Sequence, residues 1–554
     1  MATHLETLIA DALSSARRAT LGEDPEPPGA VVRPTDRPEH GDYASNLPLV
    51  AAKTQGAPPR AIAERLVAEL ERASAAATFR RIEVAGPGFI NFHLHPTAVQ
   101  SSLAALLVAG SDYGGSDCGG GTQTQIEFVS SNPTGPLTVG HGRQAVLGDV
   151  LANLHQCLGY DVKREYYFND EGRQIDLLAE SLWVRYRELQ GDAHAIPEDG
   201  YRGEYLIDVA ERVREAIGDG HERFDDETRS VFRCEAVERM TAEIKEDLSR
   251  LGVRFDDWFS EAALHRSGEV AAALEALRSR DGVYEADGAV WLAAEAHGGA
   301  KDSVLVRSDG RPTYLLVDVA YHLNKRERGF DRVIDVQGAD HHAEQTCVLA
   351  GLRILGLPED WLAYAVHQFV SLKEGGETLK MSTRAGRFVT LNDLVVELGG
   401  DVVRWFMISR KPEAHLEFDL DLARTESRDN PATYVQYAHT RIASIFRRAE
   451  VKARGMDWAS VDVSPLVVPE ELELIKSLDR FPDVVETACL SFAPHLVADY
   501  ALQLSRSFHA YYDKHRVLSE DPALTAARLA LLHGLRIVLR RSLELLGMNA
   551  PEEM

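Results

Sequence analysis

The chain lacks features that define several other classes of protein. No run of 18 or more uncharged apolar residues occurs among its 554 residues, so we expect no transmembrane helix. The N-terminal residues place Glu6 and Asp11 among apolar side chains, which is typical of an amphipathic helix and not of a signal peptide. No cysteine forms a CxxC pair, so neither a disulfide framework nor a zinc site is expected. The five cysteines are Cys118, Cys157, Cys234, Cys347 and Cys489. We therefore expect a cytoplasmic protein with no membrane partner.

Positive charge is also in deficit. The 86 acidic residues outnumber the 60 basic ones, and the formal net charge is −26. This charge argues against loose, nonspecific binding to nucleic acid. It does not exclude a specific nucleic-acid partner, because local basic faces set the field where two molecules touch. Hydrophobic residues make up 45% of the chain, enough for large cores, and the length predicts about three or four domains.

One stretch predicts the basic unit of a parallel α/β sheet. Ile126 and Phe128 alternate with polar neighbours, as on a strand. The turn formers at 132–136 can neither continue a strand nor begin a helix. Apolar residues then recur at three- and four-residue steps over 146–158, which indicates one buried helix face, and a second strand is expected at 162–168.

The expected architecture is an α/β core with a smaller module before it and helices after it. Residues 1–115 predict a small N-terminal α/β domain that ends in a glycine-rich linker. Residues 116–430 predict the sheet domain, with an acidic and mainly helical insertion at about 175–300. In this domain, Thr313–Asp318 predicts a buried strand that runs into a helix, and residues 431–554 predict a helical bundle.

Three loops are candidates for binding a ligand. The first loop is the one at 132–136, which leads into the predicted helix. At the start of that helix, backbone N–H groups favour phosphate, Gly140 permits a phosphate to approach the backbone closely, and His141 can donate a hydrogen bond. The loop at 380–387 is cationic and adjacent to glycine, so it can close over phosphate charge. The segment at 37–46 is either a binding loop or a helix lead-in capped by Ser45 or by the Asn that follows it. Singly, each is as well explained by a turn or a solvated surface loop.

Together, the first two loops resemble the HIGH and KMSKS motifs of class I aminoacyl-tRNA synthetases, and the chain is similar to the arginyl-tRNA synthetase family. The similar stretches cover nearly the whole chain. They are HGDYASN at 40–46, AGPGFINFHL at 85–94, EFVSSNPTGPLTVGHGRQAVLGD at 127–149, REYYFNDEGRQ at 164–174, GADHH at 338–342, LKMSTRAGRFVTL at 379–391 and DNPATYVQYAHTRI at 429–442.

The resemblance implies a Rossmann-like catalytic domain, an N-terminal domain that contacts tRNA, and a C-terminal bundle of the DALR anticodon-binding type. It implies that L-arginine and ATP form arginyl-adenylate and pyrophosphate, and that the arginyl group passes to the 3′ end of tRNA(Arg). The implied partners are L-arginine, tRNA(Arg) and ATP with Mg²⁺, without a tightly bound cofactor, zinc or another metal site. We expect a monomer.

The resemblance also implies the residues that handle ATP. His141 and Lys380 are the catalytic pair, and two family positions differ, because Thr138 replaces the first HIGH histidine and Thr383 replaces the second KMSKS lysine. Losing one such contact costs ~3 kcal/mol where nothing replaces it. We expect the Thr138 hydroxyl and the Arg384 charge to compensate. The implied ATP-binding residues are Pro136, Gly140, His141, Gly338, Asp340, Lys380, Met381 and Ser382.

A carboxylate pocket for arginine can be argued from chemistry as well. A guanidinium group pairs with carboxylates in a bidentate, directional way, and buried carboxylates without partners are costly. Glu127 sits on the predicted strand before the first loop and Asp318 follows another core strand, so a cationic substrate suits them. Alternatively, Glu127 pairs with an internal arginine and Tyr314 belongs to the core. The arginine-binding residues that the resemblance implies are Glu127, Ser130, Asn132, His141, Tyr314, Asp318 and His341.

The metal site, the tRNA surface and the overall activity each allow more than one interpretation. Asp340, His341 and His342 can bind a divalent metal, but the resemblance places this segment near the adenosine. The helical tail presents either basic faces that bind tRNA or faces that are only solvated. Tyr434 and Tyr437 either stack on bases or belong to the core. The basic residues of the tail are Arg441, Arg447, Arg448, Lys452, Arg454, Arg528, Arg536, Arg540 and Arg541.

Two rival functions remain for the whole chain, which are another class I synthetase and a non-catalytic tRNA-binding relative.

Overall fold

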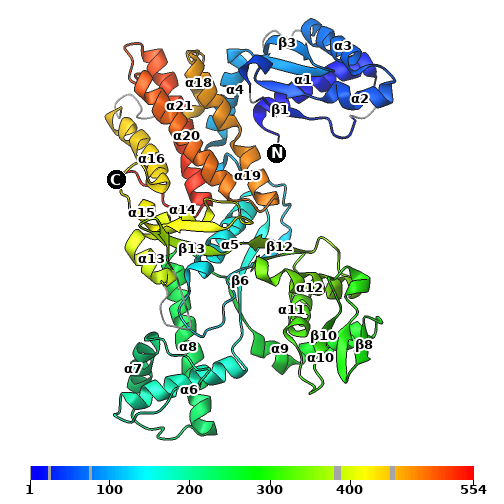
Figure 1. Ribbon diagram of the computed structural model, residues 1–554. Coiled ribbons are helices and arrows are strands. Elements are labelled where there is room, and N and C mark those ends of the chain that lie inside the picture. The colour runs from blue at the N-terminus through cyan, green and yellow to red at the C-terminus, as the bar shows by residue number, and fades with distance from the viewer. Residues whose placement is uncertain (1, 23–26, 36, 74–77, 380–388, 450–455) are drawn as a thin grey trace.

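A five-stranded parallel sheet forms the middle of the molecule, in the order β12–β11–β5–β6–β7 (Figure 1). Its strands are β5 (Gln123–Glu127), β6 (Asp161–Phe168), β7 (Asp257–Ser260), β11 (Arg332–Gly338) and β12 (Leu362–His367). The sheet confirms the predicted α/β fold class. The structure, a computed structural model, describes residues 2–22, 27–35, 37–73, 78–379, 389–449 and 456–554.

The predicted strand–loop–helix–strand unit is present. Helix α5 (Val139–Cys157) connects β5 to β6, which pair in parallel. The chain leaves the helix through Gly159, whose φ of 82° suits glycine at a helix end. The strand order reverses at β5, because β6 continues the sheet on one side of it and β11 on the other. Ligands of open α/β sheets bind beside such a reversal, at the carboxyl ends of the strands.

The predicted strand at Thr313–Asp318 is wrong, because helix α11 (Tyr314–Glu327) begins there. Thr313 is the N-cap residue, with extended backbone angles, and Leu316 and Ala320 lie on the buried face. A short apolar run looks the same in a buried strand and in the first turn of a buried helix. Asp318 therefore projects from a helix that packs over the sheet.

The segment predicted as an insertion at about 175–300 contributes two separate packed groups. In the first, α6 (Arg173–Glu188), α7 (Tyr205–Ile217) and α8 (Asp226–Arg250) share a small apolar core. Strand β7 then joins the edge of the central sheet. The second group packs with α11 and α12 (His342–Ile354) around another core. It consists of α9 (Glu261–Ser267), α10 (Glu269–Arg278) and the antiparallel strands β8 (Val283–Ala286), β9 (Ala289–Leu292) and β10 (Ser303–Val306).

The N-terminal module is a four-stranded sheet with helices packed on it. The sheet order is β1–β2–β4–β3, and the loop at 37–46 lies against the C-terminal helices. In that loop, the Asp42 carboxylate accepts from Lys476 Nζ at 2.6 Å, so the loop joins two parts of the fold. The elements are α1 (His4–Leu21), β1 (Val32–Pro34), β2 (Tyr43–Ser45), α2 (Leu47–Gln55), α3 (Pro59–Arg72), β3 (Phe79–Ala85) and β4 (Phe89–Leu94).

The C-terminal region is helical, as predicted. Helix α4 (Pro96–Ala109) lies against α18 and α21, as Figure 1 also shows. Helix α21 is long and apolar enough to cross a membrane by composition, but 61% of that window is buried inside the protein, as in a core helix. The helices are α16 (Pro431–Arg448), α18 (Pro469–Asp479), α19 (Phe481–Leu490), α20 (His495–Lys514) and α21 (Pro522–Leu545).

A smaller sheet and short helices connect the central sheet to the C-terminal helices. The sheet has the order β14–β13–β15, and β13 pairs in parallel with β15. The elements are β13 (Val370–Glu374), β14 (Glu377–Thr378), α13 (Leu391–Leu398), α14 (Gly400–Ile408), β15 (Leu416–Asp419) and α15 (Leu420–Ala423).

Candidate active site

Three carboxylates form a row across the central sheet, where the strand order reverses. Glu127 is the last residue of β5, and it pairs in register with Glu165 on β6 and Asp335 on β11. All three are buried, with 8%, 1% and 2% of their surface exposed. Three buried negative charges are costly unless cations face them, so this row demands positive partners.

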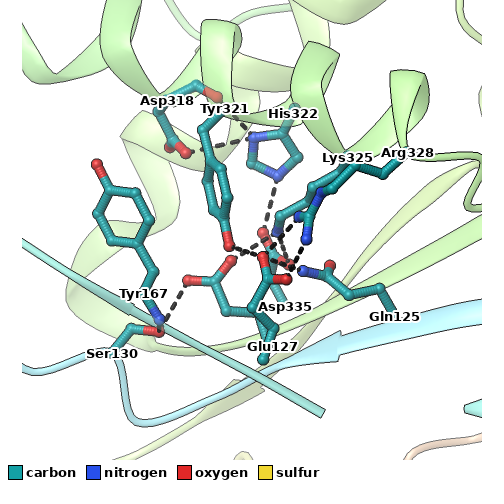
Figure 2. Close-up of polar contacts among 11 residues, drawn as sticks. Gln125, Glu127, Ser130, Tyr167, Asp318, Tyr321, His322, Lys325, Arg328 and Asp335 are labelled. Atoms are coloured by element: carbon teal, nitrogen blue, oxygen red, sulfur yellow. Dashed lines mark hydrogen bonds and ion pairs between the residues drawn. The ribbon is translucent and has the colours of Figure 1, made fainter. Parts of the chain in front are cut away.

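Helix α11 and Arg328, the residue at its C-terminal cap, supply those partners. Lys325 Nζ donates to Glu127 Oε2 at 2.6 Å and to Asp335 Oδ1 at 2.9 Å. Arg328 holds both oxygens of Glu165, a bidentate pair. His322 Nε2 lies 2.9 Å from Asp335 Oδ2, and Figure 2 shows these side chains meeting between the helix and the strands. We call these six residues and Asp318 the charged cluster.

The hydrogen bonds of the cluster indicate its protonation. Both Glu127 oxygens accept, from Lys325 and from Ser130, so this carboxylate is ionised although burial raises its pKa. Burial would also raise the pKa of Asp335, but Lys325 and His322 outweigh it and lower that pKa to about 2. Burial and Lys325 lower the pKa of His322, and Asp335 with Asp318 raises it to about 9. The Lys325 pKa is raised, because Asp335 and Glu127 outweigh burial.

The cluster keeps one surplus negative charge near its opening. Its carboxylates are Glu127, Glu165, Asp318 and Asp335, and its cations are His322, Lys325 and Arg328. Asp318 is the most accessible carboxylate, with 27% of its side chain exposed against 11% for Glu127. Its partner is His322, whose Nδ1 lies 3.3 Å from Asp318 Oδ1 (Figure 2). A cationic group that approaches Asp318 therefore meets uncompensated charge.

The loop after β5 is held in a strained conformation beside the cluster. Val129 and Ser130 have φ angles of 70° and 43°, a region that side chains other than glycine rarely adopt. Such residues cost about 1–3 kcal/mol each and persist where the surroundings enforce them. Ser130 Oγ donates to Glu127 Oε1 at 2.9 Å and accepts from Tyr167 N at 3.2 Å, which fixes the loop to β6. The strain places Ser130 next to Glu127.

The start of α5 presents a neutral histidine. Thr138 is the N-cap residue, and its backbone N–H donates to His141 Nδ1 at 3.1 Å. Burial and the neighbouring His367 lower the pKa of His141 to about 4, so the ring is neutral near pH 7. Because Nδ1 accepts, the single ring proton is on Nε2. Gly140 lies in the same first turn, and the backbone N–H groups at the start of a helix favour an anion.

The chain that follows the second predicted loop returns to this helix start. Thr390 forms a β-bridge with Thr138, and Leu391 N donates to Leu137 O at 2.8 Å. The predicted residues of the second loop lie outside the described residues: Lys380, Met381, Ser382, Thr383 and Arg384. The described residues after them place this part of the chain against the end of the first loop.

The remaining predicted site residues lie around the same strand ends. Asn132 Nδ2 donates to Gln174 Oε1 at 2.9 Å, and Pro136 is half-buried in the first loop. Gly338 ends β11, and the short helix after it carries Asp340 and His341, both exposed. Among the described residues, no group of three or more His, Cys, Asp or Glu side chains is arranged to hold a metal ion.

The structure corrects one expectation about the arginine pocket and one part of the alternative to it. Glu127 is not left without an internal partner, because Lys325 of α11 occupies one of its oxygens. Internal pairing of Glu127 therefore holds, with lysine in place of arginine. Tyr314 is not a core residue, because it begins α11 with 65% of its surface exposed.

Sequence reasoning missed the cations of the cluster. His322, Lys325 and Arg328 follow Asp318 at the spacing of one helix face, and that periodicity is a usable signal. The strand predicted at 313–318 concealed it, because a strand gives these positions no common face. Asp335 is an acidic residue between the apolar residues Ile334 and Val336 of a strand, the second available signal.

The basic residues of the helical tail divide into internal and surface groups. Arg528 is buried and donates to Glu471 Oε1 at 2.8 Å, so it does not form part of a basic surface. Arg536 and Arg540 both bind Glu552. Tyr434 and Tyr437 are half-buried and pack on His509. A surface pocket of about 470 Å³ is lined by residues that include Arg448, Tyr512, Lys514, His515 and Arg516. Lys452 and Arg454 lie outside the described residues.

Three protein families match successive parts of the chain. Residues 3–94 match the arginyl tRNA synthetase N terminal domain, and residues 102–404 match the catalytic domain of class I (R) tRNA synthetases. Residues 435–554 match the DALR anticodon binding domain.

Individual relatives extend over almost the full length. The arginine–tRNA ligase of Geotalea daltonii is 43% identical over 559 residues, covering 99% of each chain. That of Thermotoga maritima is 44% identical over 520 residues, covering 94% of each chain. The arginyl-tRNA synthetase structure from Thermus thermophilus has the same fold, with a TM-score of 0.75 and 24% identity, and it covers 99% of this chain and 100% of that one.

Proposed function

The chain belongs to the arginyl-tRNA synthetase family and carries out the ATP-dependent ligation of arginine to tRNA(Arg), and we propose that the charged cluster and the start of α5 form the two halves of its active site. The carboxylate of arginine attacks the α-phosphorus of ATP, which is used with Mg²⁺, and pyrophosphate leaves. A 3′-terminal hydroxyl of tRNA then attacks the arginyl carbonyl, and AMP leaves. The enzyme contributes positioning and electrostatic stabilisation to both steps.

The cluster binds the arginine side chain through its surplus negative charge, the observation that carries this proposal. Asp318 is exposed enough to pair with the guanidinium group, and Glu127, which is more buried, adds negative charge to the pocket. Ser130, Asn132 and Tyr314 line the approach, and His341 lies near the carboxyl end of β11. An uncharged analogue such as citrulline leaves the surplus charge unpaired and is rejected by a factor of ~10⁴.

The start of α5 binds the phosphates of ATP. His141 Nε2–H donates to a phosphate oxygen, and its neutral state keeps Nδ1 as an acceptor for Thr138 N. The Thr138 hydroxyl lies 3.3 Å from His141 Nδ1, so it helps to orient the ring. Pro136 and Gly140 shape this side of the site, and Gly338 and Asp340 lie on the adenosine side.

In this proposal, Lys380 supplies positive charge to the phosphates, and Met381 and Ser382 also bind ATP. Arg384 replaces the charge that Thr383 lacks. The Arg384→Ala variant should lower the rate of ATP–pyrophosphate exchange ~100-fold, as expected when a transition-state contact is lost. An unchanged rate would remove Arg384 from this role.

The arginine pocket is tested with Asp318→Asn, which keeps the shape and removes the charge. Loss of a charge-assisted contact should raise the arginine KM roughly 10- to 100-fold and leave the ATP KM within about twofold. The matched control is Asp331→Asn, an exposed aspartate between α11 and β11. Equal arginine KM values for the two variants would contradict the proposed pocket.

The N-terminal and C-terminal domains bind tRNA(Arg), and the protein acts as a cytoplasmic monomer. The pocket lined by Arg448, Tyr512, Lys514 and Arg516 presents positive charge beside an aromatic ring, which suits an unpaired nucleotide. We also propose that the domain boundaries lie near residues 115 and 430. Sedimentation of the purified protein tests whether it is a monomer.

A further inference from the structure

His322 is a buried histidine whose two ring nitrogens both face acceptors. Nδ1 lies 2.8 Å from the Asp318 carbonyl oxygen, and Nε2 lies 2.9 Å from Asp335 Oδ2. A carbonyl oxygen and an ionised carboxylate can only accept hydrogen bonds. Both nitrogens must therefore donate, which makes the ring a doubly protonated imidazolium.

The surroundings favour that charge. Asp335 on β11 and Asp318 on α11 carry the negative charges in contact with the ring. Lys325 opposes the imidazolium, but it is itself held by Glu127 and Asp335. The rings of Tyr321 and Trp361 meet the imidazole edge-on. The titratable and charged groups that face His322 are Asp318, Tyr321 and Lys325 from α11, Asp335 from β11 and Glu127 from β5.

We propose that His322 is a positioning residue that is protonated at neutral pH and fixes the Asp318 carboxylate toward the arginine guanidinium. This inference rests on the proposed role of Asp318 in arginine binding. The Nδ1–H group of the imidazolium donates to the main-chain carbonyl oxygen of Asp318, and Nδ1 lies 3.3 Å from Asp318 Oδ1. The ring therefore restricts both the backbone and the side chain of Asp318. A neutral ring would turn a lone pair toward one of its two acceptors and release that contact.

The charge of His322 also sets the selectivity of the pocket. With the imidazolium present, the cluster carries one surplus negative charge, which a single guanidinium neutralises. Removing the imidazolium adds a second surplus negative charge, which attracts any cation, and it releases Asp318 from the contacts that hold its carboxylate in place for directional pairing. Arginine then binds in a pocket that is no longer ordered for it, and the discrimination against citrulline weakens.

The test uses His322→Gln, which keeps a donor and removes the charge. We expect the arginine KM in ATP–pyrophosphate exchange to rise roughly 10- to 100-fold, with the ATP KM within about twofold. We also expect the preference for arginine over citrulline to fall by a similar factor. An arginine KM within about twofold of the wild-type value would overturn the proposal.

His155 provides a matched control. It is also buried, and its Nδ1 bonds to the carbonyl oxygen four residues earlier, Leu151 O, at 2.7 Å. It differs in having no carboxylate partner among the described residues, and it lies in the last turn of α5, away from the cluster. His155→Gln should therefore leave the arginine KM unchanged. Equal effects of the two glutamine variants would show a general loss of packing and contradict a positioning role.

A second measurement observes the ring directly in the wild-type enzyme. The ¹⁵N shifts of His322, assigned by their loss in His322→Gln, should show two protonated nitrogens at pH 7.5. A neutral ring would overturn the proposal even if the variant were poorly folded. Failure of the proposed pocket is a separate outcome, because it appears as a normal arginine KM in Asp318→Asn while the His322 ring remains protonated.

Discussion

At the scale of single residues, the proposed active site depends on buried charges that satisfy one another. Lys325 is fully buried and binds two carboxylates from neighbouring strands. Such a cation is not replaceable by an apolar side chain of similar length, because its partners would remain buried and ionised. The same contacts that stabilise the fold therefore fix the charge of the pocket.

Replacing Lys325 with methionine should destabilise the protein strongly. Removing one partner of a buried ion pair costs about 3–5 kcal/mol, and here two carboxylates lose their partner. The measurement is the urea midpoint followed by tryptophan fluorescence. The control is Lys53→Met on the exposed surface of α2, and the double variant Lys325→Met with Glu127→Gln should recover part of the loss. Similar midpoints for Lys325→Met and Lys53→Met would contradict this account.

At the scale of elements, α11 shows what the sequence could and could not predict. The unit around α5 was predictable, because a long periodic helix and its glycine end leave a clear pattern. Helix α11 begins with apolar residues that suit either a buried strand or a buried helix, and only the position of the sheet decides between the two. The charged cluster depends on three strands in register, Glu165 beside Glu127 beside Asp335, and no local pattern encodes that pairing.

The joint between α21 and the catalytic domain is a second feature at this scale. Arg404 of α14 binds the Leu546 carbonyl oxygen after α21, the Leu251 carbonyl oxygen after α8, and Asp149 of α5. Gly547 packs on the guanidinium of Arg404, and its φ of 68° is left-handed. One arginine thus connects the helical region to the helix that carries His141.

Gly547→Ala should disturb this joint. The new methyl group would overlap the Arg404 guanidinium, in addition to a left-handed backbone cost of about 1–2 kcal/mol. Gly56→Ala is the matched control, because Gly56 also ends a helix with a φ of 57° and has open space around it. We expect the thermal midpoint to fall clearly further for Gly547→Ala. Equal shifts would mean that the contact with Arg404 is unimportant.

At the scale of the whole molecule, buried histidines limit stability on both sides of neutral pH. Burial lowers the pKa of His155 to about 4, against the opposing hydrogen bond from the ring to the Leu151 carbonyl oxygen. A lowered folded pKa gives stability that is present above pH ~6.5 and lost as the pH falls toward 4. His322 is the reverse, because its raised pKa gives stability below pH ~6.5 that is lost as the pH rises toward 9.

The urea midpoint should therefore be highest near pH ~6.5 and fall in both directions. His155→Gln should reduce the slope on the acid side, and His322→Gln should reduce it on the alkaline side, because each removes one shifted group. The measurement is a series of urea titrations from about pH 4.5 to about pH 9, which spans both shifts. Slopes that neither variant changes would contradict the assigned protonation states.

Binding of tRNA is the other property of the whole molecule. Arg448→Ala in the pocket beside Lys514 should weaken tRNA binding and reduce the slope of log affinity against log salt by about one. ATP–pyrophosphate exchange measured with saturating tRNA should stay unchanged. The control is Arg229→Ala in the first turn of α8, a helix that packs with α6 and α7 and not with the C-terminal helices. Equal salt slopes for both variants would exclude this pocket from the tRNA interface.

In the proposed function, the charged cluster makes this ligase specific for arginine. The most direct measurement is the charging of total tRNA by the purified wild-type protein with ATP and each of arginine, citrulline and lysine. We expect rapid transfer of arginine and rejection of citrulline by ~10⁴ in kcat/KM. Comparable charging with citrulline, or no charging with arginine by folded protein, would contradict it.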